Sequence, residues 1–178
     1  AANWKTGVDA FYETYHLPWV HPQTQTVMED FSQYDLYPNG ASRMIVPICV
    51  KSHRVGDQDT VTPDLKFMLK EGGLDPASFK GSAREVRSAI QKSKRARARR
   101  VGLSHYDKLT DGQLTDSWAT GLFPNVQIGM HPEGVFMTTP SVFVATWSDG
   151  LFVCTGETRK HEHAGQSIRG LASDGYGG

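Results

Sequence analysis

Two histidines five residues apart, His16 and His21, are the residues whose type and spacing point most directly to metal chemistry. Two imidazoles and one carboxylate form the open facial site of non-haem Fe(II) oxygenases, which leaves positions free for oxygen. Glu13 lies three residues before His16, where its carboxylate can accept the N–H of the ring nitrogen that does not bind metal and so orient the ring. By itself, the spacing also fits two unrelated surface or capping histidines.

The elements that carry these residues must bring the two rings together. Apolar residues at positions 4, 8, 11 and 15 predict a helix over residues 3–16. On an unbroken helix, His16 and His21 would lie about 140° apart around the axis and could not share one metal ion. Pro18 is expected to end the helix, and Pro22 to hold His21 in extended geometry. The chain can then reverse and return His21 to His16.

The rest of the sequence alternates helical and extended patterns, which predicts an α+β fold with a largely antiparallel sheet. Helices are expected over 63–70, closed by Gly72 and Gly73, and over 82–100, where Ser82 and Glu85 form a capping box. A helical turn is expected within 112–120, and a turn at 38–40. The expected strands are 42–50, with Pro47 marking an edge or a bulge, and then 122–130, 135–137, 142–147 and 151–154.

Composition narrows the possible classes of protein. The chain has 178 residues, equal numbers of acidic and basic side chains, and no apolar run long enough to span a membrane, so neither a membrane protein nor a nucleic-acid-binding protein is expected. The two cysteines, Cys49 and Cys154, exclude a zinc ribbon and a disulfide scaffold and predict buried thiols in the cytoplasm. The N-terminal residues are expected to lie inside a longer protein.

The run Asn3-Trp4-Lys5, Asp9, Phe11, Glu13, Tyr15-His16, then His21-Pro22, resembles the start of one catalytic domain. It is similar to the large (α) subunit of Rieske-type non-haem iron aromatic-ring-hydroxylating oxygenases. A later run, residues 122–126, also resembles a strand of that domain, so the resemblance covers about residues 1–137. It implies a helix-grip fold, an antiparallel sheet wrapped round a long helix, which this chain would hold in incomplete form.

The resemblance also implies roles for individual residues. His16 and His21 match the two histidine ligands of a mononuclear Fe(II) ion. Glu13 matches the carboxylate that bridges this iron to the Rieske cluster of the neighbouring subunit during electron transfer. The third ligand, an aspartate, has no clear match; Asp149 and Asp174 are the late candidates.

Further cofactors and partners are implied for the full-length protein. Its [2Fe–2S] cluster would lie on a preceding domain, and electrons from NAD(P)H would arrive through a reductase, in some systems with a ferredoxin. O₂ and a hydrophobic aromatic substrate would be consumed by a homotrimer or an α3β3 assembly, in the catabolism of aromatic hydrocarbons. The fragment alone is expected to be inactive.

Residues 138–178 depart from the family pattern, and we hypothesise a reading-frame change or disorder there, with poor packing. Two alternatives stay open for the function: a non-catalytic helix-grip module that binds a lipid or small ligand, and a zinc hydrolase at the same histidines.

Phe11, Tyr15 and Trp19 could line a substrate pocket, although core packing also explains Phe11 and Tyr15. The basic run over 92–100 is expected to be the solvated face of a helix, with Ala96 and Val101 among its inward residues; an alternative is a docking surface for an acidic redox partner.

Overall fold

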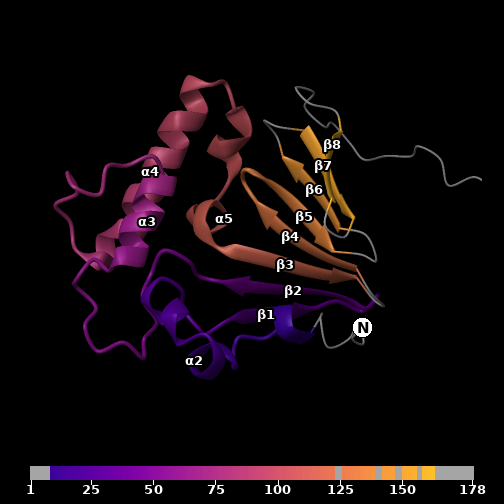
Figure 1. Ribbon diagram of the computed structural model, residues 1–178, viewed down its shortest axis with the longest axis horizontal. Coiled ribbons are helices and arrows are strands. Elements are labelled where there is room, and N and C mark those ends of the chain that lie inside the picture. The colour runs from indigo at the N-terminus through magenta and orange to yellow at the C-terminus, as the bar shows by residue number, and fades with distance from the viewer. Residues whose placement is uncertain (1–8, 123–125, 139–141, 147–149, 156–157, 163–178) are drawn as a thin grey trace, which may run out of the picture.

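The computed structural model describes residues 9–122, 126–138, 142–146, 150–155 and 158–162, with side chains described as far as residue 135. Its strands form one antiparallel sheet in which neighbours in sequence are neighbours in space (Figure 1). The strands are β1 (Gln33–Leu36), β2 (Ala41–Val46), β3 (Ser117–Leu122), β4 (Val126–His131), β5 (Gly134–Thr138), β6 (Val142–Thr146), β7 (Gly150–Thr155) and β8 (Thr158–Glu162). Together with the helices they make an α+β fold, as predicted.

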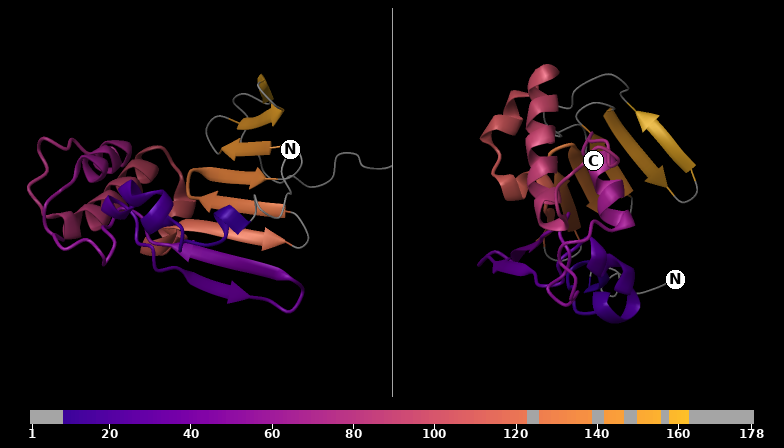
Figure 2. Two further views of the ribbon diagram at one scale, coloured as in Figure 1. Left: turned by 60° about the horizontal axis from the view of Figure 1, so that its bottom comes forward. Right: turned by 90° about the vertical axis from the view of Figure 1, so that its left-hand side faces the viewer.

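Most of the helices lie in the long connection between β2 and β3. They are α3 (Pro63–Glu71), α4 (Ala83–Arg100), the 3₁₀ helix η2 (Ser104–Lys108) and α5 (Asp111–Thr115). They gather at one end of the strands, beside the turn between β4 and β5 (Figure 2). Two short helices, α2 (Leu17–Val20) and the 3₁₀ helix η1 (Pro22–Thr26), precede β1. In the part of the chain that is described, no helix combines the length and apolar character needed to cross a membrane.

Local sequence signals set the helix boundaries. The hydroxyl of Thr62 accepts the N–H of Leu65 at 3.2 Å and caps α3, which ends at Gly72. The Glu85 carboxylate accepts the backbone N–H of Ser82 at 2.8 Å, which begins α4 as the capping box predicts. Both helix predictions are therefore confirmed. The turn predicted at 38–40 is also confirmed, and Gly40 adopts a φ of 78° there.

The main core joins α3 and α4 to the segment that follows β2. Its buried members are Cys49, Leu65, Leu69, Ala83, Val86 and Ile90. A second cluster of Met44, Val46 and Ala119 lies on one face of the sheet, against Tyr12 and Met28. The sheet face that carries this second cluster is the one on which the N-terminal segment packs.

Some of the predicted element boundaries are wrong. Residues 9–11 are helical, but the chain leaves helical geometry at Tyr12, well before residue 16. The strand expected over 42–50 ends at Val46, because Pro47 lacks the N–H that a ladder needs. The strand is also not at an edge of the sheet, since β2 pairs with both β1 and β3. The helical turn expected within 112–120 is present as α5, and β3 follows it directly. The polar stretch before residue 41 contains the unpredicted strand β1.

The basic run of α4 was expected to be a solvated face, and this is only partly right. Arg95 donates to the backbone carbonyls of Tyr106 and Leu109, at 2.7 and 2.8 Å. Lys94 donates to the carbonyl of Leu114 at 2.9 Å. These cations therefore tie α4 to the segment 104–115. Ala96 and Val101, expected to pack inward, are exposed.

Helix α3 provides a matched pair of substitutions that tests this core. Leu69 is fully buried, whereas Phe67 on the opposite side of the same helix is 60% exposed. Leu69→Ala should lower the free energy of unfolding by about 2–5 kcal/mol because it leaves a cavity. Phe67→Ala should change it by about 0.5 kcal/mol or less. Urea denaturation measures both, and equal effects would contradict the described packing of α3.

Candidate metal centre

The candidate centre lies in the segment where the first helix breaks. The hydroxyl of Tyr12 lies 3.0 Å from the carbonyl oxygens of Ser42 on β2 and Ala119 on β3, so it can donate to either strand. Burial raises the pKa of Tyr12, which keeps this donor protonated. A Cβ at Gly121 would approach the Tyr12 hydroxyl oxygen to 2.9 Å, so glycine is needed where the ring packs. Tyr12 thus fastens the chain to the sheet immediately before Glu13.

Glu13 and His16 are bound to each other directly. One carboxylate oxygen, Oε1, forms a short contact with Nδ1 of the His16 ring, and the other accepts the backbone N–H of His16 at 3.1 Å. Because Nδ1 is engaged, Nε2 is the His16 nitrogen left to bind a metal ion. This is the carboxylate–histidine pairing that orients metal ligands in many proteins.

Thr14, between these two residues, is buried and holds the segment from its other side. Its hydroxyl donates either to the carbonyl of Asp30 or to the hydroxyl of Ser32, each 2.7 Å away. Neighbouring side chains in a non-helical segment can point to opposite sides, so Thr14 turns inward while Glu13 stays free to meet His16. Leu17, the buried residue of α2, adds an apolar anchor one residue after His16.

The chain returns His21 to His16, as the proline positions suggested, but through a different conformation. Pro18 does not end a long helix. It stands in the first turn of the four-residue helix α2, where a missing N–H costs nothing. The N–H of His21 donates to the carbonyl of Leu17 at 3.0 Å, and η1 begins at the next residue. The rings of His16 and His21 lie edge to face, with their centroids 5.4 Å apart.

This separation is compatible with two ligands of one ion. Imidazoles whose nitrogens lie about 2.1 Å from a shared metal have centroids roughly 4.5–5.5 Å apart when the two bonds meet at a right angle or somewhat more. The donor set of two imidazoles, one of them oriented by a carboxylate, is also the kind that non-haem iron takes. The residues present therefore fit a mononuclear metal ion.

No third ligand joins this pair among the described residues. Asp149 and Asp174, the late aspartates considered from sequence, lie outside them. Within the described chain, the group of three potential ligands that lies close enough together is instead Glu29, Asp30 and His53. This group is not equivalent to the histidine pair, because its central carboxylate already has protein partners.

Asp30 is the centre of a polar cluster that supports the site. Its side chain is 3% exposed, and its oxygens accept the Ser52 hydroxyl at 2.6 Å and the Arg54 guanidinium at 2.5 Å. His53 pairs with Glu29 at 2.8 Å. Burial pushes the pKa of Asp30 upward, but the hydrogen bonds from Ser52 and Arg54 outweigh it and lower the pKa to about 2. The Arg54 guanidinium occupies the place beside the Asp30 carboxylate that a metal ion would take. The cluster therefore holds the loop around Asp30, whose backbone carbonyl accepts the Thr14 hydroxyl.

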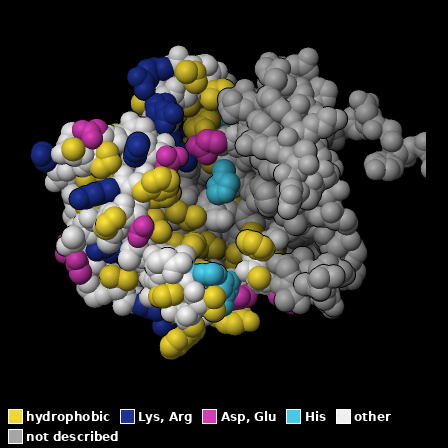
Figure 3. Space-filling view, viewed as in Figure 1, with side chains coloured by type: hydrophobic (Ala, Val, Ile, Leu, Met, Phe, Trp, Pro, Cys, Tyr) yellow, Lys and Arg dark blue, Asp and Glu magenta, His cyan; other side chains and the backbone are white. Residues whose placement is uncertain are grey.

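The aromatic residues near the histidines are at the surface. Phe11, Tyr15 and Trp19 are all largely exposed, and Trp19 is 86% exposed. Core packing, the alternative explanation for Phe11 and Tyr15, is therefore wrong for this chain. The space-filling view shows histidine and apolar side chains beside a hollow that apolar side chains line (Figure 3).

Sequence reasoning selected Glu13, His16 and His21, which lie together in the structure, but it missed the residues that position them. The side chains of Tyr12 and Thr14 form hydrogen bonds with residues 16 or more positions away. The Asp30 carboxylate accepts from residues of the chain that follows β2, 22 and 24 positions away. The sequence carried no signal for them, because a threonine beside a glutamate fits a solvated turn and the burial of Thr14 shows only in the structure.

An antiparallel α+β fold with two paired histidines and an orienting carboxylate defines a candidate non-haem metal enzyme domain. Comparison with family models gives a match over residues 1–140 to the ring hydroxylating alpha subunit, catalytic domain. The chain belongs to this family, whose members are oxygenases with non-haem iron at the catalytic site, and its fold is consistent with a helix grip. Neither curated proteins nor solved structures gave a significant match.

The low pKa of Asp30 predicts how stability depends on pH. The value of about 2 lies below the ordinary 3.8, so the carboxylate stabilises the fold above pH 5 and this contribution is lost as pH falls through 3.8 toward 2. The loss should reach about 2 kcal/mol. Asp30→Asn should be less stable at neutral pH and should show a flatter decline of unfolding free energy between pH 5 and 2.

The control is Asp107→Asn, which removes an exposed ion pair with Arg99. It should leave the pH dependence close to that of the wild type. Urea denaturation at several pH values measures all three proteins, and an unchanged slope in Asp30→Asn would show that the carboxylate is not held as described.

Proposed function

We propose that this chain provides the iron-binding part of an oxygenase that hydroxylates aromatic or related hydrophobic rings with O₂. The observation that carries the proposal is the mutual arrangement of Glu13, His16 and His21. Nε2 of His16 and the ring of His21 would hold Fe(II), and Glu13 would fix the His16 ring by keeping its Nδ1–H bound. When bound, the iron would supply the reductive activation of O₂ that an aromatic ring requires.

Electron supply belongs to the same proposal. NAD(P)H would be the source, with a reductase, and in some systems a ferredoxin, passing electrons to a Rieske [2Fe–2S] cluster on another domain. Glu13 would bridge that cluster in a neighbouring subunit to His16. Its side chain retains 20% exposure even though it is bound to His16, so a partner can reach it. We place the enzyme in the cytoplasm, where the buried thiol of Cys49 would stay reduced.

The surroundings of Glu13 favour a subunit interface. Tyr15, Trp19 and Val20 are large apolar residues that face solvent within seven positions of Glu13. Contiguous exposed apolar surface usually marks an interaction site. A homotrimer or an α3β3 assembly would cover these residues. Membership of an oxygenase family favours this enzyme over a non-catalytic ligand-binding module. We also place the end of the catalytic-domain part of this chain near residue 137.

Metal titration tests the site directly. Under anaerobic conditions, Fe(II) should bind the wild-type chain, and the His16→Ala/His21→Ala double variant should bind it at least tenfold more weakly because both imidazoles are lost. Glu13→Gln should lower the affinity by about 10–100-fold, since an amide orients the His16 ring less strongly. Isothermal titration calorimetry measures these affinities.

His53→Ala is the matched control, because it removes a histidine from the cluster around Asp30 and leaves the proposed centre unchanged. It should bind Fe(II) like the wild type. If His53→Ala loses the metal and the double variant keeps it, the centre is at Glu29, Asp30 and His53 instead. In the full-length protein, O₂-dependent hydroxylation should likewise disappear with His16→Ala.

A charge placed in the exposed aromatic surface tests the interface. Trp19→Glu should shift the full-length protein from a trimer toward monomers, because a desolvated carboxylate would lack a partner there. Sedimentation velocity measures the distribution. Phe67→Glu, which charges an exposed apolar position on α3, should leave the assembly intact. Equal assembly of both variants would mean that the surface around Trp19 is not an interface.

A further inference from the structure

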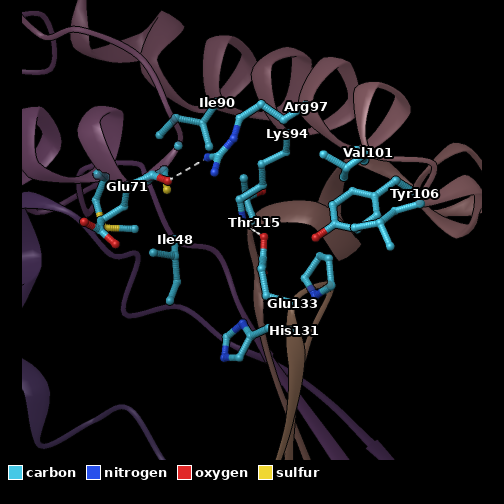
Figure 4. A pocket seen from close by; sticks show the side chains of 16 residues that line it. Ile48, Glu71, Ile90, Lys94, Arg97, Val101, Tyr106, Thr115, His131 and Glu133 are labelled. Atoms are coloured by element: carbon cyan, nitrogen blue, oxygen red, sulfur yellow. Dashed lines mark hydrogen bonds and ion pairs between the residues drawn. The ribbon is translucent and has the colours of Figure 1, made fainter. Parts of the chain in front are cut away.

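A cavity of about 530 Å³ lies between α3, α4, η2 and the turn that joins β4 to β5 (Figure 4). Its volume is within the range of small-molecule binding sites, roughly 300–1,000 Å³. None of Glu13, His16 and His21 lines it. The cavity is therefore a separate feature of the fold, to which the proposed iron chemistry assigns no role.

Most of the lining is apolar and comes from elements far apart in sequence. The apolar members are Ile48, Cys49, Met68, Ile90, Ala98, Val101, Leu103, Tyr106 and Pro132. Several of them are core residues with one side open to the cavity, so their positions are fixed by packing in the folded chain. A lining of this kind suits the apolar body of a ligand.

Two of the charged groups in the cavity wall already satisfy each other. Lys94 and Glu133 form an ion pair of 2.8 Å, and Figure 4 shows the ends of their side chains meeting. The Tyr106 hydroxyl also points toward Glu133 (Figure 4). Burial and the nearby charge of Glu133 raise the pKa of Tyr106, so the hydroxyl keeps its proton and can donate to Glu133. This group of three adds no net charge for a ligand to meet.

Arg97 differs, because its guanidinium is only weakly engaged. One of its nitrogens donates to the backbone carbonyl of Glu71, at 3.3 Å. A guanidinium carries five N–H donors, so most of them remain for another acceptor. Glu71 also lines the cavity, but within the described part of the chain Arg97 binds its backbone carbonyl and not its carboxylate.

The backbone just after α3 leaves the room that this arginine side chain occupies. Gly73 adopts a φ of +79°, and a Cβ at that position would lie 2.7 Å from Cδ of Arg97. The arginine side chain thus crosses the end of α3 at a place that only glycine leaves open. The crossing directs the guanidinium over the cavity (Figure 4).

We propose that this cavity binds a small apolar carboxylic acid. The apolar body would pack on the lining residues, and the carboxylate would pair with Arg97, the group best suited to bind it through two parallel hydrogen bonds. Binding does not involve the metal centre, so this proposal goes beyond the proposed function and does not depend on it.

Two probes that differ only in charge test the proposal on the 178-residue chain. 2-Naphthoate should bind at least tenfold more tightly than 2-naphthamide, as measured by calorimetry. Arg97→Gln should abolish this preference. Arg99→Gln is the matched control two residues along α4: its exposed ion pair with Asp107 lies outside the cavity lining, and the preference should persist.

A second variant tests where the probes bind. Val101 lines the cavity and is also exposed, so Val101→Trp can fill the opening without disturbing the core. It should weaken both probes at least tenfold, whereas His16→Ala/His21→Ala should leave both unchanged.

Three results would overturn the proposal: no binding of either probe, a preference for naphthoate that survives Arg97→Gln, or loss of binding in the histidine double variant. The last result would place the ligand at the metal centre. Because Fe(II) affinity is measured separately, failure of this proposal and failure of the proposed function can be told apart.

Discussion

The contact between the Glu13 carboxylate and the imidazole of His16 is the interaction on which the candidate centre depends. It fixes which nitrogen of His16 is free, and it uses both carboxylate oxygens, one on the ring and one on the backbone of the same histidine. Such a contact cannot form on a regular helix that continues through His16, because the backbone N–H would then be committed to an intrahelical carbonyl. The break in the helix after Phe11 is therefore a requirement of the site.

A broken segment needs other contacts to hold it, because α2 has only four residues and helices of that length are not stable alone. Tyr12 supplies a bond to the sheet, Thr14 a bond to the loop around Asp30, and Leu17 a buried apolar contact. Asp30 in turn is held by Ser52 and Arg54, from the chain that follows β2. Each bond contributes only about 1 kcal/mol, but together they determine where the two histidines lie.

Structural features that depend on residues close in sequence could be predicted from the sequence alone. The cap of α4, the glycine end of α3 and the return of His21 between two prolines are all encoded within a few residues. The misplaced boundaries have a different origin. Tyr12 leaves the helix because of hydrogen bonds to Ser42 and Ala119, which no local pattern encodes. Likewise, the basic residues of α4 were predicted to form a solvated face because several acceptors of Lys94 and Arg95 are backbone carbonyls, which carry no signature in the sequence.

The contacts that hold the histidine segment from its inner side also determine which of its residues face outward. A segment held by contacts on its inner side leaves Tyr15, Trp19 and Val20 facing outward, and hydration of these side chains is unfavourable. A solvated turn built only for stability would carry polar residues there. Aromatic residues are instead the type enriched at protein interfaces, where they supply much of the binding energy. The composition of this turn therefore fits a segment whose inner side packs on its own sheet and whose outer side packs on another subunit.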